Sequence, residues 1–113
     1  MWYHYVAYFF GGAFLGNAAP HYASGVMGRP FPSPFASPPG KGLSSPTINV
    51  LWGLFNALVG YLLLRYVGAF SLQNWSHVAT AGLGVLLMSV MLARRFGSVM
   101  GSRQSARATS TES

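Results

Sequence analysis

Long stretches of the chain contain no charged side chain, and their lengths predict membrane-spanning helices. Lys, Arg, Asp and Glu are absent from residues 1–28, 42–64 and 66–93. A bilayer core about 30 Å thick is crossed by about 20 apolar residues of α-helix, so each stretch is long enough for one span. The pattern predicts an all-α integral membrane protein that forms a single membrane domain, residues 1–113, with three spans at about 3–19, 47–70 and 76–93.

Proline, serine and arginine mark the expected ends of these helices. Pro20 lacks an amide donor and clashes with the preceding turn, so the first helix, which is apolar on all sides, should end or kink there. Pro46 suits the first turn of the second helix, and Ser76 is a plausible N-cap for the third. Arg94 and Arg95 are expected to end the third span at the interface.

Composition argues against an ordinary soluble domain. The chain is 51% hydrophobic and 7% charged, and its formal net charge is +6, whereas soluble domains average about 25% charged residues. Basic residues stay on the cytoplasmic side of a membrane, so the first loop and the tail are predicted to be cytoplasmic and the N-terminus outside. The six residues placed inside are Arg29, Lys41, Arg94, Arg95, Arg103 and Arg107, against Arg65 outside. This distribution explains the high pI without nucleic-acid binding.

The segment 20–46 is predicted to be a proline-rich cytoplasmic loop. It is rich in proline, which fixes its own backbone and disfavours helix in the residue before it, so an extended, polyproline-II-like course is expected. Phe31 and Phe35 are either anchors for a partner protein or lie on the membrane interface. The alternative is a stiff connector that shields the helix ends. Residues 96–113 are small, polar and basic, and are predicted to form a disordered tail.

Small and amide side chains recur at helical spacing and predict a packing seam. Asn49 and Asn56 are seven residues apart, and a glycine follows each by four, which places all four on one helix face. Such residues allow close approach of helices and hydrogen bonds between them, either within one chain or between copies of it. The alternative to a packing role is that the asparagines line a polar pathway or a headgroup pocket. The predicted seam comprises Gly12, Gly16, Asn17, Asn49, Gly53, Asn56 and Gly60. The third helix offers His77, Thr80, Ala81 and Gly84 for the same contact.

The chemistry available for catalysis is limited. Glu112 is the single acidic residue and cysteine is absent, which excludes paired-carboxylate hydrolysis, carboxylate-driven antiport and thiolate metal sites. His4 and His77 are expected near the outer face and His21 near the inner face. Two histidines on one face have no carboxylate to complete a metal shell, so no metal, cofactor or catalytic residue is expected. The chain is therefore not expected to be an enzyme.

Three stretches carry a family resemblance. Gly16 to Tyr22, which contains Asn17-Ala18-Ala19-Pro20-His21, resembles a family of small bacterial inner-membrane proteins with no assigned activity, as do the stretches from Ser24 to Phe35 and from Gly42 to Gly53. The resemblance covers about the first half of the chain and implies a bacterial inner membrane. It also implies one functional cluster near the cytoplasmic face, made of Asn17, Pro20, His21, Arg29, Asn49 and Trp52.

Three functions remain open from the sequence. The leading prediction is a non-catalytic accessory or assembly subunit of a membrane complex, with the Pro/Phe loop as its docking element. Its expected partners are the lipid bilayer and either a second copy or a larger membrane protein, and not nucleic acid. The alternatives are an oligomeric minimal transporter or channel, and a histidine-based metal- or cofactor-binding membrane protein.

Overall fold

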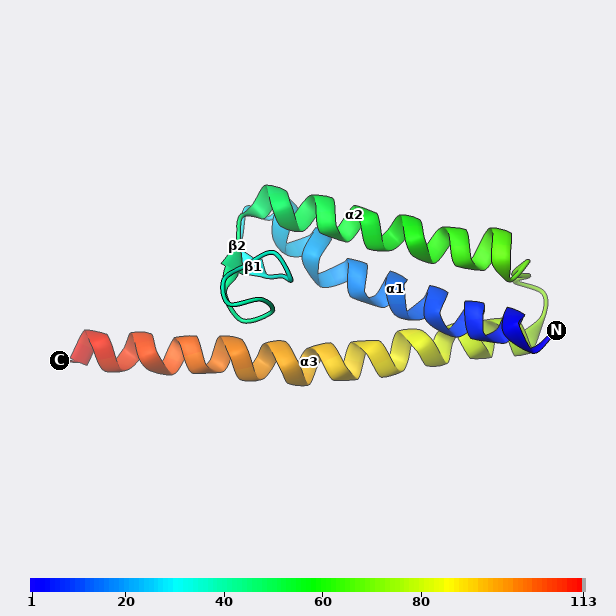
Figure 1. Ribbon diagram of the computed structural model, residues 1–113. Helices are drawn as coiled ribbons and strands as arrows, with labels where there is room; N and C mark the ends of the chain where they lie inside the picture. Colours follow the sequence, from blue (N-terminus) through cyan, green and yellow to red (C-terminus); the bar gives the residue numbers. More distant parts are fainter. Residues whose placement is uncertain (113) are drawn as a thin grey trace.

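Three helices make up most of the molecule. The computed structural model describes the backbone of residues 1–112 and the side chains of residues 1–102, and 74% of the chain is helical. The helices are α1 (Trp2–Val26), α2 (Pro46–Leu62) and α3 (Trp75–Glu112), and a π-helical turn η1 (Leu63–Val67) continues α2 (Figure 1). Between α1 and α2 the short strands β1 (Phe31–Pro32) and β2 (Leu43–Ser44) pair antiparallel, with Phe31 opposite Ser44.

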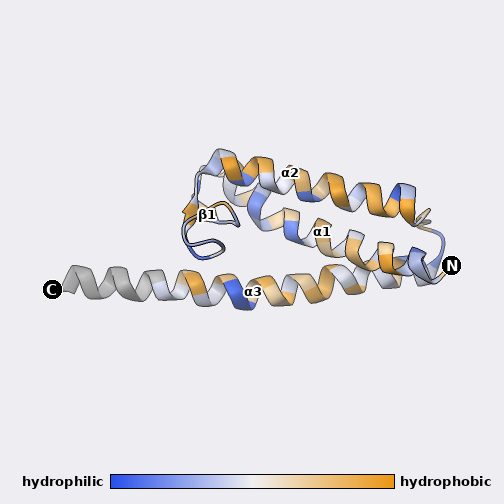
Figure 2. Ribbon diagram, viewed as in Figure 1, coloured by the Kyte–Doolittle hydropathy of each residue, from blue (hydrophilic) through white to orange (hydrophobic). Residues whose placement is uncertain are grey.

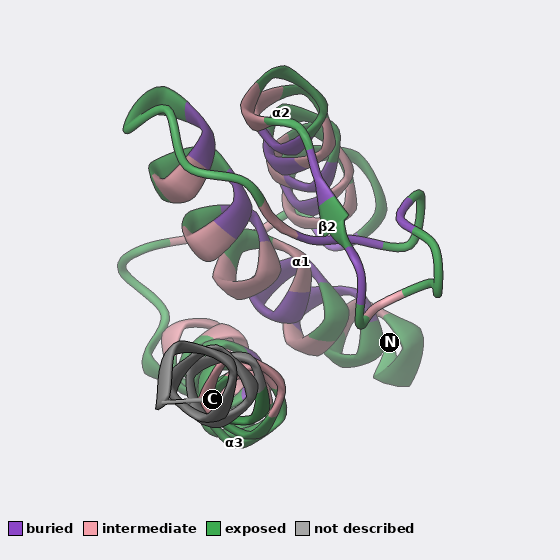
Figure 3. Cartoon of the chain, turned by 90° about the vertical axis from the view of Figure 1, so that its left-hand side faces the viewer, coloured by how far each residue is buried: buried purple, intermediate pink, exposed green. Residues whose placement is uncertain are grey.

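Of the three helices, α1 is the central one. It packs along both α2 and α3, whereas α2 and α3 hardly touch each other. Seen from one end, α1 lies between the other two helices, and buried residues mark where they meet (Figure 3). The helix α2 runs antiparallel to α1, because Gly53 adjoins Tyr22 and Gly60 adjoins Gly11. The helix α3 runs parallel to α1.

Glycines allow α1 and α3 to come into backbone contact. A Cβ on Gly12 would collide with the carbonyl group of Ala81, and a Cβ on Gly84 would collide with the carbonyl group of Phe9. Residues with a side chain would force these backbones apart, as at the close crossings of membrane helices. Two glycines, one from each helix, thus set the separation of α1 and α3.

Two segments are long and apolar enough to cross a membrane. Among the described residues they are Pro46–Val67 and Trp75–Ser102. In Figure 2, orange marks the hydrophobic residues along these helices. Leu51, Leu58 and Leu86 are each more than half exposed, so these side chains face the surroundings rather than a protein core. Exposed apolar surface of this extent is typical of contact with lipid or with another protein.

The first helix differs from the expected helix that is apolar on all sides. It is not among the two segments apolar enough to span, and the prediction of a third span stays a prediction. Two of its polar side chains, Asn17 and His21, are instead bonded to α2. A helix placed between two others has less surface to turn toward lipid, which permits these polar groups and the many glycines of α1.

The first helix also continues past its expected end. It includes Pro20 and ends at Val26, so the predicted start of the loop at residue 20 is wrong. Proline removes one hydrogen bond of the helix, but the following turns are held by α2: Gly25 lies against Pro46 and Val50, and a Cβ at Gly25 would come within 2.6 Å of the Pro46 carbonyl oxygen. Tertiary packing therefore outweighs the local effect of the proline.

Two other boundaries differ from the prediction. The second helix ends with η1 at Val67 rather than at residue 70, because the chain turns at Gly68, where the Tyr8 ring packs and its hydroxyl donates to the Gly68 carbonyl. The third helix begins at Trp75. Its capping residue is Asn74 rather than Ser76, since the Asn74 side chain accepts a hydrogen bond from the Ser76 amide at 3.0 Å.

The proline-rich segment is folded back on itself. The Ser33 hydroxyl bonds the Ser44 hydroxyl at 2.6 Å and accepts the Phe35 amide at 3.1 Å, so the loop is a closed turn rather than an extended connector. The backbone of residues 96–112, most of the predicted disordered tail, continues α3. Residues 103–113 lie outside the part whose side chains are described.

Candidate functional site

Polar side chains gather where α1 ends, α2 begins and the loop folds over both. The helix α3 passes the same place with Arg95 and Phe96, since the rings of Phe31 and Phe96 lie 4.7 Å apart between centroids. Four segments that are distant in sequence therefore meet at one end of the molecule. We call this region the loop end.

Asn49 joins three of these segments. Its side chain is fully buried, and its amide nitrogen donates to the carbonyl oxygens of Phe31 at 3.0 Å, Ser45 at 3.1 Å and Ser44 at 3.3 Å. Its amide oxygen lies 2.8 Å from Nδ1 of His21. One side chain thus binds the start of α2, both strands of the loop and the last turns of α1.

These bonds indicate that Nδ1 of His21 carries a proton. The three carbonyls accept from the Asn49 nitrogen, so the Asn49 oxygen is an acceptor and Nδ1 of His21 must carry the proton. The His21 ring is 2% exposed and meets Phe31, Trp52 and Phe96 edge-on, at centroid distances of 5.6, 6.4 and 5.7 Å. His21 is therefore fixed in one orientation by an amide on one side and aromatic rings on the others.

A second polar pair, made of two amides, lies about one turn earlier on α1 and about two turns later on α2. The Asn17 amide donates to the Asn56 oxygen at 2.9 Å, and the Asn56 amide donates to the Trp52 carbonyl at 2.8 Å. Asn17 and Asn56 also line an apolar groove of about 380 Å³ that is bordered by Gly84 and Met88 of α3. The pair bonds α1 to α2 and is the polar part of this groove.

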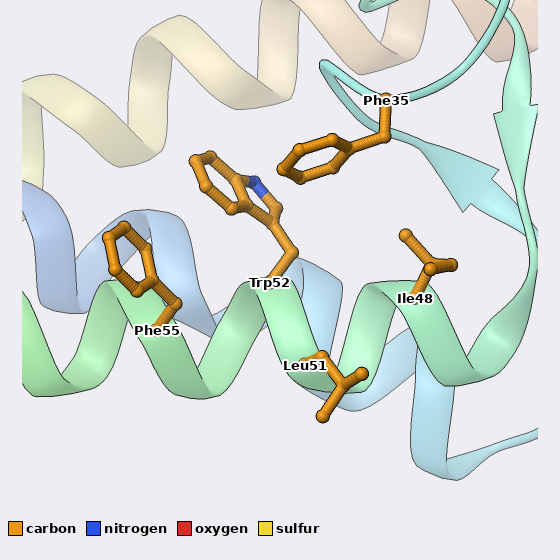
Figure 4. A pocket seen from close by; sticks show the side chains of 5 residues that line it. All are labelled: Phe35, Ile48, Leu51, Trp52 and Phe55. Atoms are coloured by element: carbon orange, nitrogen blue, oxygen red, sulfur yellow. The ribbon is translucent and has the colours of Figure 1, made fainter.

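Two further hollows flank Trp52. One is an apolar groove of about 290 Å³ on the surface of α2, lined by Phe35, Ile48, Leu51, Trp52 and Phe55. Figure 4 shows the Phe35 ring reaching from the loop over Trp52, with the indole nitrogen on the side of the ring toward Phe35. The other is a cavity of about 180 Å³ between the helices and the loop, with His21, Ser33, Trp52 and Arg95 in its wall.

The predicted seam residues lie at helix contacts. Asn49, Gly53, Asn56 and Gly60 are the buried positions of α2, and they face α1. Gly16 approaches Val85 and Met88 of α3, and a Cβ there would be in ordinary contact with them, at 3.5 and 3.6 Å. Gly12 meets Ala81 of α3, and Asn17 meets Asn56.

The cluster implied by the resemblance is only partly brought together. Asn17, His21 and Trp52 share the wall of the small cavity, and Asn49 bonds His21. Arg29 is exposed and does not line the cavity, and Pro20 lies within α1.

Sequence reasoning missed Ser33, Ser44, Arg95 and Phe96 at the loop end. One feature of the sequence could have indicated Arg95: the predicted topology placed Arg95 and His21 at the same face of the membrane.

The loop phenylalanines have different surroundings. Phe31 lies against His21 and Phe96, so its ring is committed to the interior of the loop end. Phe35 is 65% exposed. Only Phe35 remains a candidate for docking.

The other histidines lie at the opposite end of the molecule. His77 packs against the Tyr8 ring at 4.3 Å between centroids, and its Nδ1 accepts the Ser71 amide at 3.1 Å. His4 contacts the neighbouring Tyr3 ring. Among the described residues, no group of three or more His, Cys, Asp and Glu side chains lies close enough to hold a metal ion.

Comparison with known proteins gives no assignment. No protein-family model, curated protein or solved structure matches the chain. The resemblance to small bacterial inner-membrane proteins therefore has no support from these comparisons. The loop end itself offers hydrogen bonds, a cation and apolar hollows.

Proposed function

We propose that this protein spans the bacterial inner membrane three times and serves as a non-catalytic accessory or assembly subunit of a membrane complex. The single observation that carries the proposal is the apolar groove beside Phe35. The groove is built on a loop that buried hydrogen bonds hold in place, and it presents exposed aromatic surface at one end of the molecule. In this proposal the His21–Asn49 pair has a structural role: it holds the loop that carries Phe35 against the helices.

The arrangement of the helices supports three spans and the proposed orientation. The parallel course of α1 and α3, with α2 antiparallel, places the loop and the Arg94–Arg95 pair at the same end, where Gly40 approaches Arg95. Arg29 and Lys41 belong to that loop. The positive-inside rule assigns such an end to the cytoplasm. The N-terminus of α1 then lies outside.

The groove has the properties of a docking site for an apolar side chain or helix of a partner subunit. Phe35, Leu51 and Phe55 are each more than half exposed, and an aromatic side chain over a preformed hollow is typical of binding hot spots. Trp52 stacks on Phe55 at 5.7 Å between centroids. The surface is therefore pre-organised, which lowers the entropic cost of binding.

Replacing Phe35 with alanine is expected to release the partner. In a mild-detergent extract of native membranes, the tagged wild-type chain should recover a larger membrane protein in fixed stoichiometry, identified by mass spectrometry and sized. Phe35→Ala should lower that recovery about tenfold, as expected for loss of a hot-spot aromatic side chain.

Leu86→Ala is the control, because Leu86 is another large apolar side chain that is more than half exposed, lies on α3 and does not line the groove. It should retain the partner. Recovery of a homogeneous self-oligomer alone, or equal recovery with both variants, would contradict the accessory role and favour an autonomous pore or carrier.

A transporter is the second candidate, and the groove containing Asn17 and Asn56 favours it. A polar pair within an apolar groove resembles the lining of a substrate path in an oligomer. Labelling of a single introduced cysteine with a polar thiol reagent would reveal such a path. Gly53, on the seam, cannot accept a cysteine, since a Cβ there would lie 2.7 Å from the Tyr22 amide nitrogen. Met88, in the wall of the groove, is a better position.

Cysteine at Met88 is expected to resist a charged, membrane-impermeant thiol reagent. The chain has no native cysteine, so Met88→Cys and the outward-facing control Leu86→Cys each carry a single thiol. Both should stay unmodified in native membranes if the groove is covered by lipid or helix. Rapid labelling of Met88→Cys with an inert Leu86→Cys would reveal water in the groove and support a transport path.

A further inference from the structure

The small cavity at the loop end has a cation and one unpartnered hydrogen-bond donor in its wall. Arg95, an exposed residue, contributes to its wall, and no carboxylate occurs among the side chains of residues 1–102 to neutralise the guanidinium. Trp52 forms another part of the wall, and its indole nitrogen is the one buried side-chain nitrogen or oxygen without a hydrogen-bond partner among the described residues. A buried donor without a partner, such as this indole nitrogen, is uncommon in folded proteins and calls for an explanation.

The position of Arg95 depends on the fold of the loop. Gly40 has φ +73°, a backbone conformation that glycine adopts readily, and a Cβ at Gly40 would lie 3.3 Å from a guanidinium nitrogen of Arg95. The loop backbone thus lies directly beside the guanidinium. Much of the remaining wall is apolar, from Pro32, Pro34 and Phe96. Apolar walls strengthen the attraction between a cation and an anion inside the cavity.

We propose that this cavity binds a phosphate group through the Arg95 guanidinium, with the phosphodiester of an anionic phospholipid from the cytoplasmic leaflet as its source. A guanidinium binds two phosphate oxygens at once, and a further oxygen supplies an acceptor for the Trp52 indole. The site adjoins the Phe35 groove, with Trp52 in the wall of both, and adds a ligand to the proposed function. It lies at the end of the molecule to which the basic residues assign the cytoplasmic headgroups.

Trp52 offers a direct readout of binding. Trp2 and Trp75, the other two tryptophans, are 76% and 85% exposed, so Trp2→Phe and Trp75→Phe leave Trp52 as the single fluorophore. This protein, purified whole in an uncharged detergent, is titrated with dihexanoyl phosphatidylglycerol, with dihexanoyl phosphatidylcholine and with inorganic phosphate. We expect a saturable change in Trp52 emission with phosphatidylglycerol, at lower concentration than with phosphatidylcholine.

Substitution of Arg95 tests the assignment. Arg95→Gln should weaken phosphatidylglycerol binding about tenfold or more, because the bidentate charged pair is lost. The affinity of Arg95→Lys should lie between those of the wild type and Arg95→Gln. Arg94→Gln removes the same charge from the adjacent position, which is also exposed but does not line the cavity, and should change binding less than about twofold, as expected of a surface charge. Circular dichroism shows whether each variant keeps its helical content.

Each result decides the proposal. Saturation by inorganic phosphate at similar concentration, sensitive to Arg95→Gln, would support the phosphate site and replace the lipid by a free phosphate as its source. No saturable change with any of the three, or equal weakening by Arg94→Gln and Arg95→Gln, would overturn it. Partner recovery through Phe35 is measured separately, so this failure would leave the accessory role intact.

Discussion

Asn49→Asp is expected to destabilise the protein by about 2–4 kcal/mol, because a buried polar group that loses its partners costs about 1–3 kcal/mol and a buried unpaired charge costs more. The substitution keeps the size of the side chain and the oxygen that faces His21. It removes the amide donor and places a carboxylate oxygen against the carbonyls of Phe31, Ser44 and Ser45. The loop end should open first, since those three bonds hold it to α2.

Thermal unfolding in detergent, followed by circular dichroism, measures the loss. Hydrogen exchange of residues 31–45 should rise before that of α1 and α3. Asn74→Asp is the matched control: the same chemical change at an exposed helix cap, where aspartate caps as well as asparagine. It should shift stability by less than about 0.5 kcal/mol. Equal effects of the two substitutions would show that the hydrogen bonds of Asn49 do not hold the loop to the helices.

Gly84→Ala is expected to separate α3 from α1. The added Cβ would overlap the Phe9 carbonyl and lie 3.0 Å from the Ala13 amide nitrogen, and backbone atoms cannot move aside as side chains do. Overpacking of this kind costs about 1–3 kcal/mol. The variant should unfold at lower temperature and lose the Tyr5–Ser76 hydrogen bond at the far end of the same contact.

Gly82→Ala provides the control within the same helix. A Cβ at Gly82 meets nothing within 4 Å, and alanine is the better helix former by about 1 kcal/mol. This variant should be as stable as the wild type or more so. Destabilisation by Gly82→Ala equal to that by Gly84→Ala would refute the α1–α3 contact.

Local patterns in the sequence determined the number of helices and much of the packing face of α2. Long stretches without charge gave the helical segments, because a charge in the middle of an apolar helix is costly and therefore marks its ends. The spacing of Asn49, Gly53, Asn56 and Gly60 gave one face, because residues three and four apart lie on the same side of a helix. Both features depend on helix geometry alone, which is why they can be read from the chain.

Tertiary structure decided which groups meet and where the first helix ends. Pro20 predicts a helix end by local rules, yet the contact of Gly25 with Pro46 and Val50 carries the helix to Val26. The central position of α1 turns its polar residues toward its neighbours. Neither effect has a local signal, because each depends on residues more than twenty positions away in the chain.

The candidate site shows the same division. The sequence placed His21, Asn49 and Trp52 at one depth, since they flank the same loop. It did not place Arg95 beside Gly40, or Ser33 beside Ser44, because those contacts require the loop to fold back on itself and α3 to pass beneath it. Depth along a helix follows from counting residues, whereas position around the bundle axis follows only from how the three helices pack.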